Sequence, residues 1–211
     1  MSGFMRMEKL WAAKDLTWAG LAVLFAGMSL ARVPAPALAA PPPDCQTQAE
    51  GETLARASPD MTAWHIAIPD IGVDASVVPV WADTNCGMGV PDRPDVVGWY
   101  APGPLPGARG NALLDGHVDW TNRETGIPFT GVFWELGALR PGAQVIISDG
   151  VNEYTYLVTE KRRYYWDDPQ GASVLRATAQ ARITMITCGG IFDRATHNYS
   201  MRQIVIAELE E

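Results

Sequence analysis

The chain has 211 residues, which is enough for one domain and an appendage. Hydrophobic residues make up 47% of it and charged residues 19%, a composition that favours a packed core over disorder. The formal net charge is −8. The first 40 residues hold four of the 16 basic and two of the 24 acidic side chains, so residues 41–211 carry 12 basic and 22 acidic side chains. This excess of acidic side chains argues against nucleic acid as a partner.

The N-terminal 40 residues have the pattern of an export segment. Residues 16–31 carry no charge and follow three basic side chains within the first 14 positions. A basic flank before an apolar run keeps the N-terminus in the cytoplasm and directs the rest across the membrane. The run is short for a span, which needs about 20 residues, and residues 37–39 read Ala-Leu-Ala, as at a signal-peptidase site. Residues 1–40 are therefore either a single membrane anchor or a cleaved signal, and both place the body outside the cytoplasm.

Residues 41–62 are interpreted as a proline-rich linker. Pro41-Pro42-Pro43 forms a stiff, extended spacer that is neither helical nor central in a sheet. The linker is expected to end near Thr62, which leaves residues 63–211 as the folded domain.

The domain is predicted to be all-β, because short apolar runs alternate with Gly, Pro and Asp from residue 64 onward. Closing such strands into a barrel removes exposed edges, so a closed or nearly closed β-barrel is the expected architecture. The candidate strands are Trp64–Ile68, Ser76–Val80, Asn111–Asp115, Gln144–Ser148, Asn152–Glu160, Ile183–Thr187 and Gln203–Leu209.

The sequence also predicts some of the connections between these strands. Asp149-Gly150 predicts a hairpin turn between two strands. Residues 90–110, with five prolines and four glycines, are expected to form a structured loop. Short helices are expected near residues 133–136 and 173–179.

Of the three cysteines, Cys188 is the candidate nucleophile. It follows an apolar strand and precedes Gly189-Gly190, which would present the thiol at a barrel rim with little steric cover. Cys45 in the linker and Cys86 in a glycine-rich stretch are either inert or joined to each other. The odd number means that at least one thiol is free or pairs between chains.

His117 is the candidate acid/base, because it also lies just past a strand on a glycine-loosened turn. His65 alternates within the first strand and is interpreted as a wall residue, and His197 has no assigned role. No residue is assigned to orient the His117 ring: Asp119 is close in sequence, but the direction of its side chain does not follow from the sequence.

Arg202 is placed by topology. The strands ending at Thr187 and starting at Gln203 are consecutive and joined by a short connection, so they are expected to be antiparallel neighbours. Cys188 and Arg202 then face each other at one end of the barrel. A cation favours the reactive thiolate, an Arg can hydrogen-bond an oxyanion, and an imidazolium can protonate a leaving amine.

At these residues the sequence resembles the sortase family, most closely class F sortases, over about residues 64–209. Residues 183–188 (Ile-Thr-Met-Ile-Thr-Cys) resemble the TLxTC strand of that family and residues 202–207 its R-x-I-x-V-A segment. Residues 116–119 match the GHVD of class F, residues 66–74 resemble its opening strand, and residues 97–107 its Gly-Trp-Tyr loop.

The resemblance implies an eight-stranded barrel that cleaves an LPxTG-like signal between Thr and Gly. Cys188 would form the thioacyl intermediate, His117 would act as acid/base, and Arg202 would stabilise the oxyanion. The expected partners are surface proteins with a C-terminal LPxTG-like signal and an amine acceptor such as a peptidoglycan precursor, with hydrolysis when no amine is present. After Asp119 the chain continues with a longer, bulkier stretch than is familiar in the family, so no exact sorting motif is transferred.

Three alternatives stay open. A cysteine peptidase would use the same chemistry mainly for hydrolysis, although a papain-like enzyme has its Cys before its His. An L,D-transpeptidase would carry a Ser-His-Gly-Cys stretch, whereas Cys188 follows Ile186-Thr187. A wall-facing β-barrel binding module would keep Cys188 as a buried apolar residue. No cofactor or metal site is expected, because no His/Cys pair has ligand spacing and no acidic run suits calcium.

Overall fold

The computed structural model describes residues 60–83 and 87–210. The expected export segment, most of the linker, and Cys45 and Cys86 lie outside the described residues. Within the described part of the chain, no helix is long and apolar enough to span a membrane.

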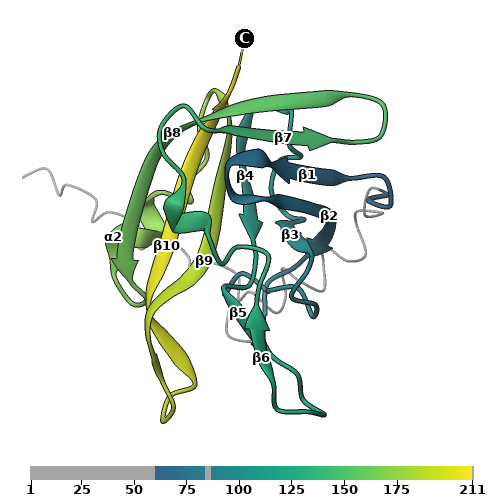
Figure 1. Ribbon diagram of the computed structural model, residues 1–211. Coiled ribbons are helices and arrows are strands. Elements are labelled where there is room, and N and C mark those ends of the chain that lie inside the picture. Colours follow the sequence, from purple (N-terminus) through teal and green to yellow (C-terminus); the bar gives the residue numbers. More distant parts are fainter. Residues whose placement is uncertain (1–59, 84–86, 211) are drawn as a thin grey trace, which may run out of the picture. The chain divides into compact units, whose positions relative to one another are not determined.

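Eight strands close into a barrel in the order β1-β2-β3-β4-β9-β10-β8-β7, and β5 and β6 form a separate two-stranded hairpin (Figure 1). Strand β1 pairs with both β2 and β7, and the second of these pairings closes the barrel. The predicted all-β, closed eight-stranded barrel is thus confirmed. The strands are β1 His65–Ile68, β2 Val73–Val80, β3 Val97–Tyr100, β4 Gly110–Asp115, β5 Asp119–Thr121, β6 Pro128–Thr130, β7 Gln144–Ser148, β8 Glu153–Tyr165, β9 Ala181–Asp193 and β10 Asn198–Leu209.

The barrel interior is filled by the alternate side chains of its strands. In β2, for example, Val73, Ala75 and Val77 are buried while Asp74 and Ser76 are exposed, as the period of two in a strand requires. The largest side chains that are fully buried include Trp99, Tyr156 and Phe133. These belong to one continuous core that involves the strands all around the barrel.

The predicted hairpin at Asp149-Gly150 is confirmed and joins β7 to β8. Gly150 has a φ of 88°, and the Asp149 carboxylate accepts hydrogen bonds from the backbone N–H groups of Val151 (2.8 Å) and Asn152 (2.6 Å). The left-handed glycine and the side-chain cap together fix this turn.

Strand β3 corrects the prediction that residues 90–110 form a loop throughout. It pairs in parallel with β2 and antiparallel with β4, and therefore belongs to the barrel wall. Gly98 lies in it because a Cβ atom there would come within 2.9 Å of Val80 and 3.0 Å of Pro91. A short strand that contains a glycine, required by close packing with neighbouring residues, shows little strand pattern in its own sequence.

Both predicted helices are displaced along the chain. The helix expected at 173–179 is α2, Pro169–Ser173, which begins where Asp168 accepts a hydrogen bond from the backbone N–H of Gln170. The one expected at 133–136 is a 3₁₀ turn, Leu136–Ala138. In α2 the cap and the proline at the first helical position set the start.

Strands β4, β9 and β10 lie side by side and carry most of the candidate residues. Strand β9 is parallel to β4 and antiparallel to β10 (Figure 1). The antiparallel pairing expected between the strands of Cys188 and Arg202 is therefore confirmed.

The strand ends differ from the prediction. Strand β9 continues past Cys188 to Asp193, and β10 begins at Asn198 instead of Gln203. The two glycines after Cys188 do not end the strand. Gly189 pairs regularly with Met201, and a bulge follows in which Gly190 and Ile191 stand opposite Ser200.

Candidate active site

Cys188 and Arg202 stand directly opposite each other on β9 and β10. Residues opposite in an antiparallel pair project to the same face of the sheet. The next pair on that face, Ile186 and Ile204, belongs to a small apolar cluster with Val174, separate from the barrel core. Cys188 and Arg202 therefore face outward from the barrel, on a surface partly covered by the segment that follows α2.

His117 is brought level with Cys188 by the parallel strand β4. Asp115 is the partner of Ile186, and His117 lies two residues beyond Asp115 just as Cys188 lies two beyond Ile186. The two chains stay together past the end of β4, because the Gly116 N–H donates to the Ile186 carbonyl (3.2 Å). The Thr187 hydroxyl also donates to the Gly116 carbonyl (2.7 Å). The three candidate residues thus form one row across β9, β10 and the turn after β4, which we call the catalytic row after the role proposed for it.

The imidazole of His117 is held by two contacts. Its Nε2 lies 2.7 Å from the Pro91 carbonyl oxygen, and its ring packs edge-on against Trp120 with centroids 4.7 Å apart. A carbonyl only accepts, so Nε2 carries the proton, and Nδ1 is the nitrogen through which the ring can exchange one. The nearby Asp119 does not orient this ring: it accepts a hydrogen bond from the Tyr199 hydroxyl instead.

The turn that carries His117 is closely packed, so that neither Gly116, which precedes His117, nor Gly131, which lies against it, leaves room for a Cβ atom. A Cβ atom at Gly131 would lie 2.2 Å from the His117 carbonyl oxygen, and one at Gly116 would lie 2.6 Å from the Phe133 ring. The Phe133 N–H donates to that same carbonyl (2.9 Å). The backbone of His117 is therefore fixed by the segment that follows β6.

The guanidinium of Arg202 is anchored at the start of β10. Nη1 donates to the carbonyl oxygens of Met201 (3.0 Å) and Tyr199 (3.2 Å), and Nη2 donates to Oδ1 of Asn198 (2.9 Å). A guanidinium has five N–H donors. These bonds leave Nε–H and the second Nη2–H to bind an oxygen of a ligand.

Four effects act on the ionisation of Cys188. Burial raises the pKa of the thiol, the Arg202 guanidinium lowers it, and Asp115 and Asp119 raise it. Arg202 is thus the group that favours the thiolate. Asp115 itself is buried, which raises its pKa to about 7 against the opposing effect of Arg202. Asp115 has no predicted role in the sequence analysis, because only the pairing of β4 with β9 brings it to this face.

A hollow of about 490 Å³ opens beside Cys188. It lies between the β9–β10 hairpin, the turn after His117 and the segment around the 3₁₀ turn. Exposed aromatic side chains border it, including Trp134 and Phe192. Its lining is Val118, Asp119, Trp134, Gly137, Arg163, Cys188, Gly189, Gly190, Phe192, Tyr199 and Gln203.

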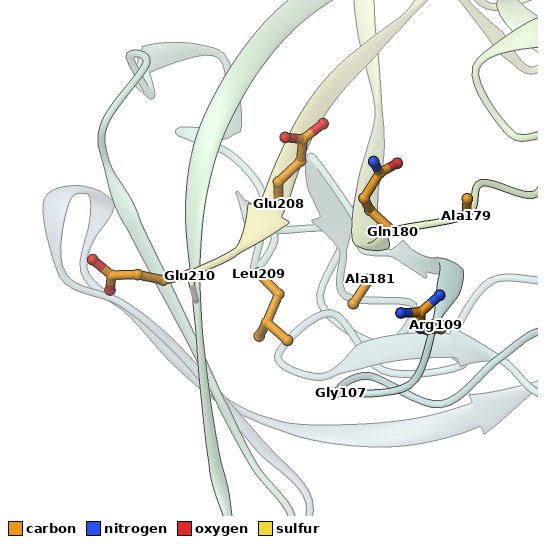
Figure 2. A pocket seen from close by; sticks show the side chains of 8 residues that line it. All are labelled: Gly107, Arg109, Ala179, Gln180, Ala181, Glu208, Leu209 and Glu210. Atoms are coloured by element: carbon orange, nitrogen blue, oxygen red, sulfur yellow. The ribbon is translucent and has the colours of Figure 1, made fainter.

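A larger hollow, of about 840 Å³, lies where β4 and β9 begin and β10 ends, away from the catalytic row. Its charged side chains are Arg109, Glu208 and Glu210, and Figure 2 shows Glu210 turned away from the other two. Its lining contains no thiol, whereas the lining of the smaller hollow includes Cys188. The smaller hollow is therefore the better candidate for chemistry, despite its size.

The remaining histidines take no part in the catalytic row. His65 lies in the wall strand β1, as expected, where its ring hydrogen-bonds Asp74. His197 is exposed in the turn between β9 and β10 with a φ of 52°. Among the described residues no group of three or more His, Cys, Asp or Glu side chains is arranged to hold a metal ion.

Comparison with known proteins gives one family and one fold. Residues 66–210 match the Sortase domain family. No curated protein sequence is similar enough to count as a match.

Solved structures of several sortases share the fold. Sortase A of Listeria monocytogenes is 24% identical, with a TM-score of 0.53 over 72% of this chain and 89% of that one. The sortase D5 transpeptidase of Clostridium perfringens is 21% identical, with a TM-score of 0.53 over 78% and 88%. Sortase C-1 of Actinomyces oris is 20% identical, with a TM-score of 0.53 over 79% and 81%.

Proposed function

The chain belongs to the sortase family of cysteine transpeptidases, and we propose that it cleaves an LPxTG-like sorting signal between Thr and Gly and transfers the acyl group to an amine. The observation that carries the proposal is the catalytic row, in which Cys188 pairs with Arg202 on β10 and lies level with His117 after β4. Within the family, the GHVD at residues 116–119 favours class F.

In the first step the Cys188 thiolate attacks the carbonyl carbon of the Thr residue. The tetrahedral oxyanion accepts hydrogen bonds from the free N–H groups of Arg202, which stabilise charge that develops only in the transition state. The C–N bond to Gly then breaks, and His117 gives a proton to the departing amine. The product is a thioester on Cys188.

In the second step an amine attacks the thioester carbon, and His117 removes a proton from that amine. Collapse of the new tetrahedral intermediate breaks the C–S bond and restores the thiolate. When water attacks in place of an amine, the result is hydrolysis. The proposed acceptor is the amine of a peptidoglycan precursor or of another protein.

The hairpin β5–β6 is the proposed reason for a distinct substrate preference. It contains the stretch after Asp119 that departs from the family pattern, and its turn is built by Asn122, whose Oδ1 accepts from the N–H groups of Glu124 and Thr125 (both 2.9 Å). Trp120 of this hairpin packs on His117. A substrate that reaches His117 would meet this hairpin.

The test is cleavage of a panel of quenched fluorescent LPxTG-like peptides, with and without triglycine. We expect Cys188→Ala to abolish turnover and Arg202→Ala to lower it by about 10²- to 10³-fold, as for loss of an oxyanion donor. Arg109→Ala is the matched control, because this exposed arginine lies at the larger hollow, and it should leave turnover unchanged. Triglycine should yield a ligated product detectable by mass spectrometry.

Two outcomes would redirect the proposal. Cleavage that depends on Cys188 but never yields a ligated product with any amine would favour a hydrolytic peptidase. No cleavage, together with a Cys188 that iodoacetamide does not label in the folded protein, would favour the binding module.

The proposed location is outside the cytoplasm, with residues 1–40 as a membrane anchor or as a cleaved signal. Its support is the apolar run after a basic flank. Protease added to intact cells should digest the domain if it is exported. Survival of the domain until the cells are lysed would contradict export.

A further inference from the structure

Asp115 is a buried carboxylic acid on the same face as the catalytic row. It is the last residue of β4 and is 9% exposed. It stands opposite Ile186 on β9, and Cys188 lies two residues after Ile186 on that strand. Its neighbour Leu114 stands opposite Met185 and points into the barrel core, so Asp115 points outward. On the other side of β4 its partner is Gly98, which has no side chain to cover it.

The charged and titratable groups around Asp115 come from each adjoining element. Arg202 of β10 acts on Asp115, and Asp115 acts on Cys188 of β9; His117 and Asp119 follow Asp115 within four positions along the chain. Arg202 acts on both Asp115 and Cys188, whereas Asp115 and Asp119 both oppose ionisation of Cys188. Arg202 is therefore a cation that favours the ionised form of two acidic groups, the Asp115 carboxyl and the Cys188 thiol.

We propose that Asp115 is a positioning residue for the nucleophile: its carboxyl group shares Arg202 with Cys188, so that the charge on Asp115 sets how readily the thiol ionises. This rests on the proposed function only in taking Cys188 as the nucleophile. Asp115 itself neither attacks the substrate nor donates to it.

The direction of the effect follows from the charges. Burial raises the pKa of Asp115 to about 7, so below that pH the carboxyl is neutral and the thiol alone benefits from Arg202. Above it the carboxylate adds a negative charge beside Cys188 and raises the pKa of the thiol. Ionisation of Cys188 should therefore spread over a wider pH range than a single group would show.

The experiment measures the rate at which iodoacetamide alkylates Cys188 in the full chain between pH 5 and 9.5. Peptide mass spectrometry follows Cys188 separately from Cys45 and Cys86. The unsubstituted protein should give a profile broader than a one-proton curve. In Asp115→Asn the profile should become a one-proton curve with a lower midpoint, and alkylation at pH 8 should be about three- to tenfold faster.

Asp70→Asn is the matched control, because Asp70 is exposed in the turn after β1. It should leave the profile unchanged. An Asp115→Asn protein with native circular dichroism and an unaltered profile would overturn the proposal. Should that variant fail to fold, Asp115→Ser replaces it, and a one-proton profile in the unsubstituted protein would itself overturn the proposal.

The readout is independent of any substrate. Failure to cleave LPxTG-like peptides would contradict the proposed function. It would not change the alkylation profile, by which the role of Asp115 is tested. An altered profile in Asp70→Asn would show that the effect arises from net charge alone, and would also overturn the proposal.

Discussion

At the scale of single residues, one hydroxyl helps to keep the members of the catalytic row level with one another. Thr187 is 3% exposed, and its Oγ1 donates to the Gly116 carbonyl, the last link between β9 and the turn that carries His117. Threonine would ordinarily be explained here by its preference for strands. Its hydroxyl has the further effect of keeping His117 level with Cys188.

Replacing Thr187 by Val should therefore affect both stability and activity. The Gly116 carbonyl would lose its partner in a buried place, which costs about 1–2 kcal/mol of the free energy of unfolding. Urea denaturation measures this loss, and peptide cleavage should fall with it because the turn of His117 loosens. Thr178→Val is the control: it removes a similar bond to the Gln180 carbonyl (3.0 Å), but an exposed one that water can replace. Equal losses in the two variants would contradict the argument.

At the scale of elements, the bulge in β9 decides where the hairpin beyond the catalytic row points. Gly190 has a φ of 79°, and the Ser200 hydroxyl accepts a hydrogen bond from the Ile191 N–H (2.9 Å). A Cβ atom at Gly190 would lie 2.4 Å from that hydroxyl oxygen. The bulge lies two residues from Cys188 and fixes the register at which Arg202 meets it.

Gly190→Ala should damage the site as well as the fold. The positive φ costs a non-glycine residue about 1–3 kcal/mol. The added atom would also displace the Ser200 hydroxyl from the Ile191 N–H and press on Met201, the residue before Arg202. Gly142→Ala is the control, because Gly142 has a φ of 90° but nothing within 4 Å of the added atom. We expect both variants to lower the melting temperature, and only Gly190→Ala to lower turnover measured well below melting. Full turnover in Gly190→Ala would show that the register tolerates the change.

At the scale of the whole molecule, the sheet β4-β9-β10 has two apolar faces of unequal size. The inner face belongs to the large barrel core. On the outer face only Ile186, Ile204 and Ile206 form a buried apolar cluster, together with Val174 from the end of α2. Because local stability follows buried apolar contact, the segment over the outer face should be the weaker part of the fold.

Hydrogen–deuterium exchange followed by mass spectrometry can measure this difference. Amides of residues 169–175 should exchange well before those of β4 and β9, because opening this segment gives up the small outer cluster and the hydrogen bonds of Asn111 and Arg182 to the Val174 carbonyl, but leaves the barrel core intact. An LPxTG-like peptide bound to Cys188→Ala should slow exchange there if it lies on the outer face. Exchange of residues 169–175 at the rate of β9 would contradict the prediction.

The sequence by itself determined the fold class, most strand positions and the three members of the catalytic row. Alternating apolar residues and turn signals act locally, so β7 was predicted with its observed bounds and the turn at Asp149-Gly150 at its observed place. The antiparallel pairing behind Cys188 and Arg202 followed from a short connection alone. The roles of these residues in catalysis stay predictions.

Only the tertiary structure decided the rest, because it depends on partners distant in the sequence. β3 is a strand because β2 and β4 flank it, although its own glycine and the prolines around it indicate a loop. The strand continues through the two glycines after Cys188 because β10 lies opposite: Met201 pairs with Gly189, and a bulge places Gly190 and Ile191 against Ser200. Asp115 faces Cys188 because β4 and β9 run parallel in one register, 71 residues apart at Asp115 and Ile186. Contacts between residues so far apart in the sequence leave no pattern in the chain near either residue.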